Sequence, residues 1–220
     1  MLLRLLHLCD SLFPIGSFGY SDGLEAAVVR APSGVEWPGA TYEGLRDWLD
    51  VCLDETIGRL EGPTVWRAHR AFASGDGAAL AILEDETIAL RPSSEARKAS
   101  RSMGHRLLTT WAAIYPDPRL NVTRSLPVAF GCVCAASDID ARSATEAFAY
   151  TRLAATASAA MRLMRIGQTD AHRVLARTLG RVPAVVDGLI ARDANPESFM
   201  PNADIALMTH QYLHSRLFRT

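Results

Sequence analysis

Residues 140–166 read DARSATEAFAYTRLAATASAAMRLMRI and form the longest stretch of the chain with helical periodicity. Apolar side chains recur along one face of this helix, among them Phe148, Leu153 and Met164. The many alanines are strong helix formers, and they leave a slim surface against which other helices can pack closely. We therefore expect one long α-helix here.

Two further stretches show the same rhythm. Residues 41–60 and 93–114 carry apolar side chains at steps of three and four, which is the pattern of an amphipathic helix. Ser93 or Ser94, directly after Pro92, can cap the second helix because a serine oxygen accepts a hydrogen bond from a free N–H of the first turn. Both stretches are predicted to be helical.

The periodicity is interrupted where Gly, Pro, Asn and Asp cluster. These breaks lie at residues 31–40, 74–77, 116–121 and 193–202. The apolar run 126–136 has the composition of a buried strand, but one strand does not make a sheet. The sequence therefore predicts an all-α fold, with residues 1–220 in a single domain of eight to ten helices.

The composition is that of an ordinary globular protein. Hydrophobic residues make up 49% of the chain and charged residues 21%, and the formal net charge of -1 provides no basic field for nucleic acid. The N-terminal run MLLRLLHLCD is short and interrupted by Arg4 and His7, so it does not resemble a signal peptide. No apolar stretch is long enough to span a bilayer. We expect a cytoplasmic protein that binds neither nucleic acid nor membranes.

The pentapeptide Gly19-Tyr20-Ser21-Asp22-Gly23 matches the G-x-S-x-G pattern of a serine hydrolase. That motif requires a buried strand before the serine, whereas Pro14 and Gly16 interrupt the preceding segment. The competing interpretation is a glycine-containing loop that caps a helix. A hydrolase that uses Ser21 remains the alternative function.

Two patterns are candidates for metal binding. His210 and His214 are four residues apart, which places them on one face of a helix, but Gln211 stands where a zinc protease carries glutamate. The four cysteines lack the spacing of a zinc site and are expected to be buried and reduced; they are Cys9, Cys52, Cys132 and Cys134. We predict no metal site, with a histidine-based metal-binding protein as a third hypothesis.

A basic stripe follows the helix predicted at residues 93–114. Arg97, Arg101 and His105 recur at steps of four, with Lys98 and Arg106 beside them. Such a stripe is either a solvated helix face balanced by acids elsewhere or a docking face for an acidic partner. The chain also contains no phosphate-binding loop, no dinucleotide motif and no pair of acids in apolar surroundings. It therefore reads as a helical interaction protein without catalytic residues.

Four segments resemble the urease accessory protein F (UreF) family. The first and last are the most specific: DSLFPIGSFGYSDGLEAAV at residues 10–28, and the segment 201–220, which ends in SRLFRT. SEARKASRSMGHRLL at residues 94–108 and PVAFG at residues 127–131 are similar to family segments in the same order along the chain. PVAFG leads to the long alanine-rich helix and to RIGQ at residues 165–168, so the four matching segments are spread from residue 10 to residue 220.

The resemblance implies an all-α homodimer that acts in the cytoplasm as a chaperone and scaffold, not as an enzyme. Its implied partners are accessory proteins similar to UreD (called UreH in some species) and to the GTPase UreG. The first bridges to the urease apoenzyme and the second carries nickel. Nickel is then cargo for the client enzyme and not a cofactor of this chain.

The resemblance and the residue types together predict two contact segments, residues 1–20 and 201–220. Aromatic side chains in the N-terminal loop make a binding hot spot if they are exposed, and arginines around an apolar pair suit docking. Phe13 is equally well explained as a core residue, and Glu25 as a helix-terminus charge. The predicted partner-binding residues are Phe13, Pro14, Phe18, Tyr20, Glu25, Arg97, Arg101, Arg216 and Arg219.

Some positions depart from the family pattern. Thr169-Asp170-Ala171 follows Gln168 where the family often repeats a Gly-Gln step, and Ser93-Ser94-Glu95 replaces Thr-Arg-Glu. Thr209 and Gln211 replace a basic and an acidic residue before the C-terminus. These changes leave open whether this chain contacts the usual partners through the same residues.

Overall fold

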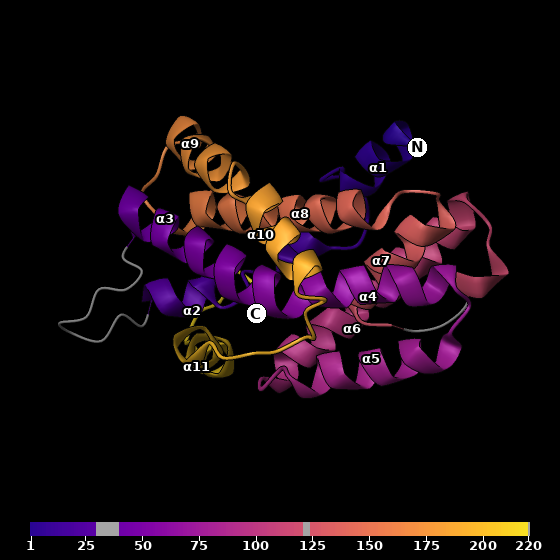
Figure 1. Ribbon diagram of the computed structural model, residues 1–220. Coiled ribbons are helices and arrows are strands. Elements are labelled where there is room, and N and C mark those ends of the chain that lie inside the picture. The colour runs from indigo at the N-terminus through magenta and orange to yellow at the C-terminus, as the bar shows by residue number, and fades with distance from the viewer. Residues whose placement is uncertain (30–39, 121–123, 220) are drawn as a thin grey trace.

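The computed structural model describes residues 1–29, 40–120 and 124–219, and within these ranges the chain forms helices and no strand (Figure 1). The α-helices are α1 Leu2–Cys9, α2 Leu24–Val29, α3 Tyr42–Val51, α4 Gly62–Ala73, α5 Gly77–Ala89, α6 Ser94–Ile114, α7 Leu126–Ala136, α8 Ala141–Leu163, α9 Gln168–Leu179, α10 Val182–Ala191 and α11 Pro201–Thr209. A π-helical stretch, Cys52–Glu61, joins α3 to α4 in one continuous rod. If α3 and α4 are counted as one rod, the eleven described α-helices form ten separate helices. This confirms the predicted all-α fold of eight to ten helices.

Helix α8 is the predicted long helix, and it supports most of the structure. Asp140 caps its N-terminus, since the Asp140 carboxylate accepts a hydrogen bond from the Ser143 N–H at 2.9 Å. This bond lowers the pKa of Asp140. Helix α8 contacts α1, α2, α3, α4, α7, α9 and α10. Phe148 belongs to one cluster of buried side chains and Leu153 to the other, so α8 contributes to both parts of the core.

Helix α7 is formed by the one segment whose secondary structure the sequence left ambiguous. Residues 126–136 form a helix and not a strand, and every residue from Leu126 to Cys134 is buried. A helix that is apolar on all sides is surrounded by protein on all sides, which explains why periodicity could not separate it from a buried strand. Pro127 lies in the first turn, where a missing N–H costs nothing.

Two glycines let the neighbouring helices approach α7 closely. A Cβ atom on Gly131 would lie 2.7 Å from the carbonyl oxygen of Val65 in α4. A Cβ atom on Gly104 of α6 would lie 2.6 Å from the Ser125 carbonyl carbon and 2.8 Å from the Leu126 nitrogen. Real Cβ atoms do not approach main-chain atoms so closely, so both positions require glycine.

Helix α6 also confirms its predicted start. The Ser93 oxygen accepts a hydrogen bond from the Ala96 N–H at 3.3 Å. Farther along the chain, the Glu84 carboxylate of α5 accepts hydrogen bonds from the Ser125 N–H at 2.8 Å and the Ser125 hydroxyl at 2.7 Å. A negative charge at the N-terminus of α7 also complements the helix dipole. Glu84 therefore joins α5 to α7.

A chain of buried ion pairs connects four segments. Arg152 of α8 binds Asp22 at 2.8 Å and Glu61 at 3.0 Å, and Glu61 also binds Arg91 at 2.6 Å. The Glu61 side chain is 2% exposed. Its burial would raise its pKa, but the guanidinium groups of Arg152 and Arg91 outweigh this effect and hold the pKa of Glu61 below its usual value. A cavity of about 60 Å³ lies beside these residues.

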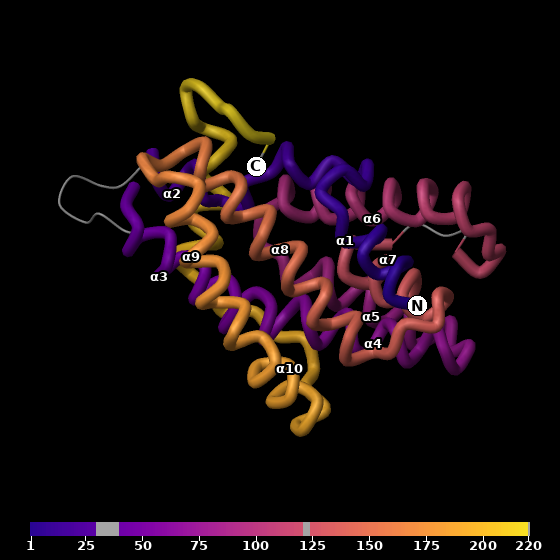
Figure 2. The backbone as a smooth tube through the Cα atoms, turned by 90° about the horizontal axis from the view of Figure 1, so that it is seen from above, coloured from indigo at the N-terminus to yellow at the C-terminus, as the bar shows by residue number. Residues whose placement is uncertain are grey.

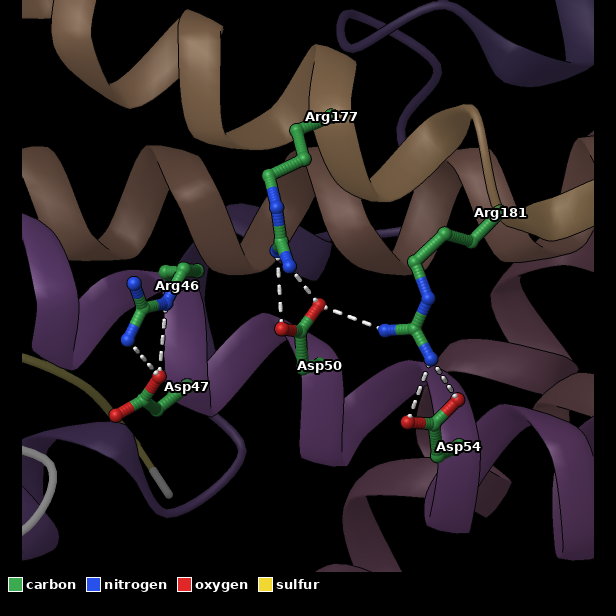
Figure 3. A network of polar contacts seen from close by, with 6 residues as sticks. All are labelled: Arg46, Asp47, Asp50, Asp54, Arg177 and Arg181. Carbon is green, nitrogen blue, oxygen red and sulfur yellow. Dashed lines mark hydrogen bonds and ion pairs between the residues drawn. The ribbon is translucent and has the colours of Figure 1, made fainter.

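A second network lies on the surface between α3 with its π-helical continuation and the α9–α10 pair (Figure 3). Arg177 and Arg181 both bind Asp50, at 2.9 and 2.8 Å, and Arg181 also binds Asp54 at 2.8 Å. Asp50 is partly buried, but Arg177, Arg181 and Asp54 are more exposed, so each pair contributes little stability. The network mainly fixes the orientation of the two helix pairs.

The segment after α10 crosses the joined helix and carries the chain to α11 (Figure 1). Arg67 donates to the Ala194 carbonyl at 2.9 Å, and the Glu197 N–H donates to the Arg59 carbonyl at 2.9 Å. These contacts bring α11 against α2. None of the described helices has the length and apolar character needed to cross a membrane.

We expect Gly104→Ala to lower the free energy of unfolding by about 2 kcal/mol, because the clash is with main-chain atoms that cannot rotate away. Gly77→Ala is the matched control, since nothing lies within 4 Å of its added methyl group, and it should be neutral or stabilising. Urea denaturation checks both variants. Equal midpoints for the two would show that α6 and α7 are not packed as described.

We expect Glu61→Gln to cost about 3–5 kcal/mol at pH 7, because it leaves buried guanidinium groups unmatched. The Glu61 pKa is lower in the folded state, so its contribution is present above the unfolded value of about 4.3 and is lost as the pH falls through the folded value. The difference between wild type and variant should therefore shrink in acid. Asp54→Asn, which removes an exposed partner, should cost less than about 1 kcal/mol.

Candidate partner-binding surface

The N-terminal loop and the C-terminal tail lie side by side and form one surface (Figure 2). The Arg219 N–H donates a hydrogen bond to the Gly19 carbonyl at 2.8 Å. The tail, residues 213–219, follows the short 3₁₀ turn His210–Tyr212 and contains no helix. The two segments predicted separately as contact segments are therefore adjacent. We call residues 14–19 and 214–219 together the composite surface.

The shape of the N-terminal loop decides which aromatic residues reach solvent. Gly16 has φ of 78°, and a Cβ atom there would lie 2.5 Å from a guanidinium nitrogen of Arg106. The 3₁₀ turn Ser17–Gly19 follows and projects Phe18 outward, leaving it 74% exposed. Phe18 is therefore the large apolar side chain that this loop offers to another protein.

The other two aromatic residues predicted to bind a partner, Phe13 and Tyr20, face the core. Phe13 is 6% exposed, and its ring centroid lies 5.8 Å from that of Trp111 and 5.3 Å from that of His7. Tyr20 is 8% exposed. Pro14 lies at the surface between them. The core interpretation of Phe13 is the one that the structure favours, and the same applies to Tyr20.

Glu25 is buried and binds the tail of its own chain. Its carboxylate accepts hydrogen bonds from the Leu217 N–H at 2.6 Å, the Phe218 N–H at 3.1 Å and the His210 imidazole at 2.8 Å. The residue is 3% exposed. Such a group cannot pair directly with a base on another protein while the tail is in place. Its predicted role in partner binding would therefore have to be indirect.

Arg162 completes the junction between loop and tail. Its guanidinium lies 4.3 Å from the centroid of the Phe218 ring, and it donates to the Phe18 carbonyl at 3.2 Å. Phe218 is 4% exposed, whereas Leu217 is 54% exposed. The tail therefore buries Phe218 and exposes the preceding Leu217, so that Leu217 and Phe18 form the apolar part of the composite surface.

The cations around this apolar part have no acidic partner among the described residues. They are Arg106, Arg162, Arg216 and Arg219. Many other surface arginines form ion pairs, as Arg142 does with Asp187. An unbalanced basic surface with exposed apolar side chains at its centre favours a partner with an acidic rim.

The predicted basic stripe of α6 is used partly within the chain. Arg97 donates to the carbonyls of Arg91 and Pro92, at 2.5 and 2.9 Å, just after α5 ends. Arg101 is exposed and lies 3.9 Å from Glu84. Among the described residues, no hydrogen bond or ion pair joins either arginine to the tail. Their role in partner binding stays a prediction, as do the roles of Arg216 and Arg219.

The structure offers no support for the two chemical alternatives. Ser21 is 1% exposed, and its oxygen accepts a hydrogen bond from the Glu25 N–H at 3.4 Å, so it caps the turn before α2 and is closed to a substrate. His210 and His214 do not share a helix, because α11 ends at Thr209, and His210 is buried against Glu25. The described residues contain no group of three or more side chains suited to a metal ion.

Arg106 and Arg162 lie beside the composite surface, but neither is among the partner-binding residues predicted from the sequence. Arg106 was noted only as a neighbour of the stripe, and nothing in the local sequence separates Arg162 from other arginines. The pairing of Glu25 with His210 spans 185 residues, so no local pattern reports it. The single usable signal was Gly16, since a glycine beside a functional loop often marks the close approach of another group.

A groove beside the composite surface has a volume of about 590 Å³ and lies between α1 and α8. Small side chains of α8 form its floor, and they include Ala147, Ala154, Ala155 and Ser158. Leu6 of α1 and Phe18 of the N-terminal loop also line the groove and are 57% and 74% exposed. Large exposed apolar side chains beside a hollow of small ones are typical of a protein–protein contact.

Comparison with known proteins agrees with the sequence resemblance. A family model described as UreF matches residues 40–179. A urease accessory protein UreF from Rhodopseudomonas palustris (strain BisA53) is 33% identical over 227 residues, which cover 100% of this chain and 93% of the relative. Proteins of the same name from Azoarcus sp. (strain BH72) and Methylobacillus flagellatus are each 31% identical over 100% of this chain, and the matches cover 95% and 97% of the relatives. The chain therefore belongs to the UreF family of urease accessory proteins.

Proposed function

We propose that this chain is a cytoplasmic, non-catalytic scaffold in the maturation of urease, and that it promotes nickel insertion into the apoenzyme. Its partners would be a UreD- or UreH-like protein and a UreG-like GTPase. The composite surface is the observation that carries the proposal, because exposed Phe18 and Leu217 lie there beside four arginines that have no acidic partner among the described residues. The family assignment supports the biological context, since the relatives are named urease accessory proteins.

A scaffold of this kind needs shape and charge and no reactive group. Phe18 and Leu217 offer apolar area that gains free energy when another protein removes it from water. Arg216 and Arg219 can bind carboxylates in a bidentate manner and accelerate association with an acidic surface. Nickel remains cargo of the assembly, and we assign it no ligands in this chain.

We further propose that the α1–α8 groove joins two copies of the chain. A twofold interface requires a patch that is complementary to itself. The groove region meets this requirement, because it contains both the exposed Leu6 of α1 and a floor of small side chains on α8. Leu6 of one copy can enter the hollow around Ala154 of the other.

Co-purification tests the scaffold role most directly. The tagged chain is expressed with its UreD- or UreH-like and UreG-like proteins, and at least one of them is expected to elute with it. Failure of both to co-purify would sink the proposal. Washing with increasing salt gives a second readout, since an interface built on arginines weakens as charges are screened.

We expect Arg216→Ala to weaken assembly by roughly 1–2 kcal/mol, which corresponds to a five- to thirtyfold higher Kd. Arg192→Ala is the matched control, because Arg192 is also exposed and lies after α10, away from the tail. Biolayer interferometry on folded proteins measures both. Unchanged binding by Arg216→Ala would remove that residue from the surface.

We expect Ala154→Arg to convert the dimer to a monomer, because a long charged side chain would fill the groove and carry charge into the interface. Ile82→Arg, at an exposed position of α5, should leave the dimer intact. Sedimentation equilibrium gives the two masses. A dimer in both variants would place the interface elsewhere.

A further inference from the structure

The tail is held by very few contacts. Residues 214–217 and 219 are exposed, and only Leu213 and Phe218 are buried. Apart from these two side chains, the tail is fixed by the Arg219–Gly19 hydrogen bond and by the two main-chain N–H groups that reach Glu25. Within the described chain, residues 214–219 make three main-chain hydrogen bonds, and loss of the Glu25 carboxylate removes two of them.

The arrangement around Glu25 is a built binding site for a peptide segment. A carboxylate offers only acceptors, and here donors from three positions meet it: His210, Leu217 and Phe218. Hydrogen bonds to a charged group are stronger than neutral ones, and burial removes competing water. The Phe218 ring against Arg162 sets which residues of the tail face the carboxylate. The two main-chain hydrogen bonds to Glu25 and the buried Phe218 side chain together fix the register of the tail.

This site lies directly behind the composite surface. Leu217 donates its N–H inward to Glu25 while its side chain points to solvent, so the same residue connects the buried carboxylate to the exposed apolar part. A free tail would have to lose conformational entropy when a partner binds. A tail that is already fixed avoids this cost.

We infer that Glu25 is a positioning residue: it holds the C-terminal tail against the N-terminal loop and so preassembles the partner-binding surface, without touching the partner. The inference rests on the proposed function for its biological consequence, but tail fixation can be measured without any partner. His210 supports the carboxylate from the end of α11, and Ser21 orients the turn that carries it.

Hydrogen exchange on the full-length chain tests tail fixation. In Glu25→Gln, one acceptor oxygen is replaced by an NH₂ group that faces main-chain donors. The amides of Leu217 and Phe218 should then exchange roughly tenfold faster for each hydrogen bond lost. Glu84→Gln is the matched control, because Glu84 is also a buried carboxylate that accepts a main-chain hydrogen bond, but at the start of α7. It should leave tail exchange unchanged.

Tail amides that exchange at the wild-type rate in Glu25→Gln would overturn the inference. If this variant does not fold, Glu25→Asp keeps the charge beside His210 but withdraws the carboxylate from the tail by one methylene group. Tail exchange should then rise while core amides of α7 and α8 keep their protection. Wild-type protection of the tail in that variant would equally contradict the inference.

Binding of the accessory partners separates this inference from the proposed function. The comparison variant is Phe18→Ser with Leu217→Ser, which alters the surface and leaves the Glu25 hydrogen bonds in place. Weaker binding by both this variant and Glu25→Gln, by tenfold or more, supports positioning. If only the surface variant loses affinity although the tail of Glu25→Gln is free, the positioning role is wrong. If neither loses affinity, the composite surface is not the docking site.

Discussion

A guanidinium group buried beside carboxylates must be matched by charge and by hydrogen bonds, because an unmatched charge in a protein interior costs several kcal/mol. Arg152 satisfies this condition by binding Asp22 and Glu61 together. Asp22 sits at φ of 49°, an uncommon conformation for a residue with a side chain, in the turn that leads into α2. The ion pair therefore fixes this turn on α8, and everything that α2 carries is placed relative to the long helix.

The position of the composite surface follows from that anchor. Helix α2 begins directly after the fixed turn and presents Glu25 inward, and Glu25 binds the tail. From the C-terminal side, hydrogen bonds to Arg59 and Arg67 hold the segment after α10 on the joined helix. This segment leads to α11, which packs against α2. Two ends of the chain that are about 200 residues apart thus meet by separate routes, one through α2 and the other through α11.

The sequence predicted the helices well because their signals are local. Periodicity and caps located α6 and α8, including the Ser93 cap, since both depend on residues within one or two turns. Helix α7 remained ambiguous because a fully buried helix has no polar face. The contact segments were predicted from family resemblance, but their internal arrangement was not. Which aromatic residue faces solvent depends on the φ angle of Gly16, and the burial of Glu25 depends on a tail that comes from the other end of the chain.

The adjacency of loop and tail has a practical meaning for anyone who labels or fuses this protein. An affinity tag after Thr220 would extend from the tail beside Phe18, and one before Met1 would extend from α1 beside the groove. Either tag would sit at a proposed interface. The turn Ser74–Asp76 between α4 and α5 belongs to neither surface, and Gly75 there has open space around it, so a reporter inserted at this turn would leave both contact regions free.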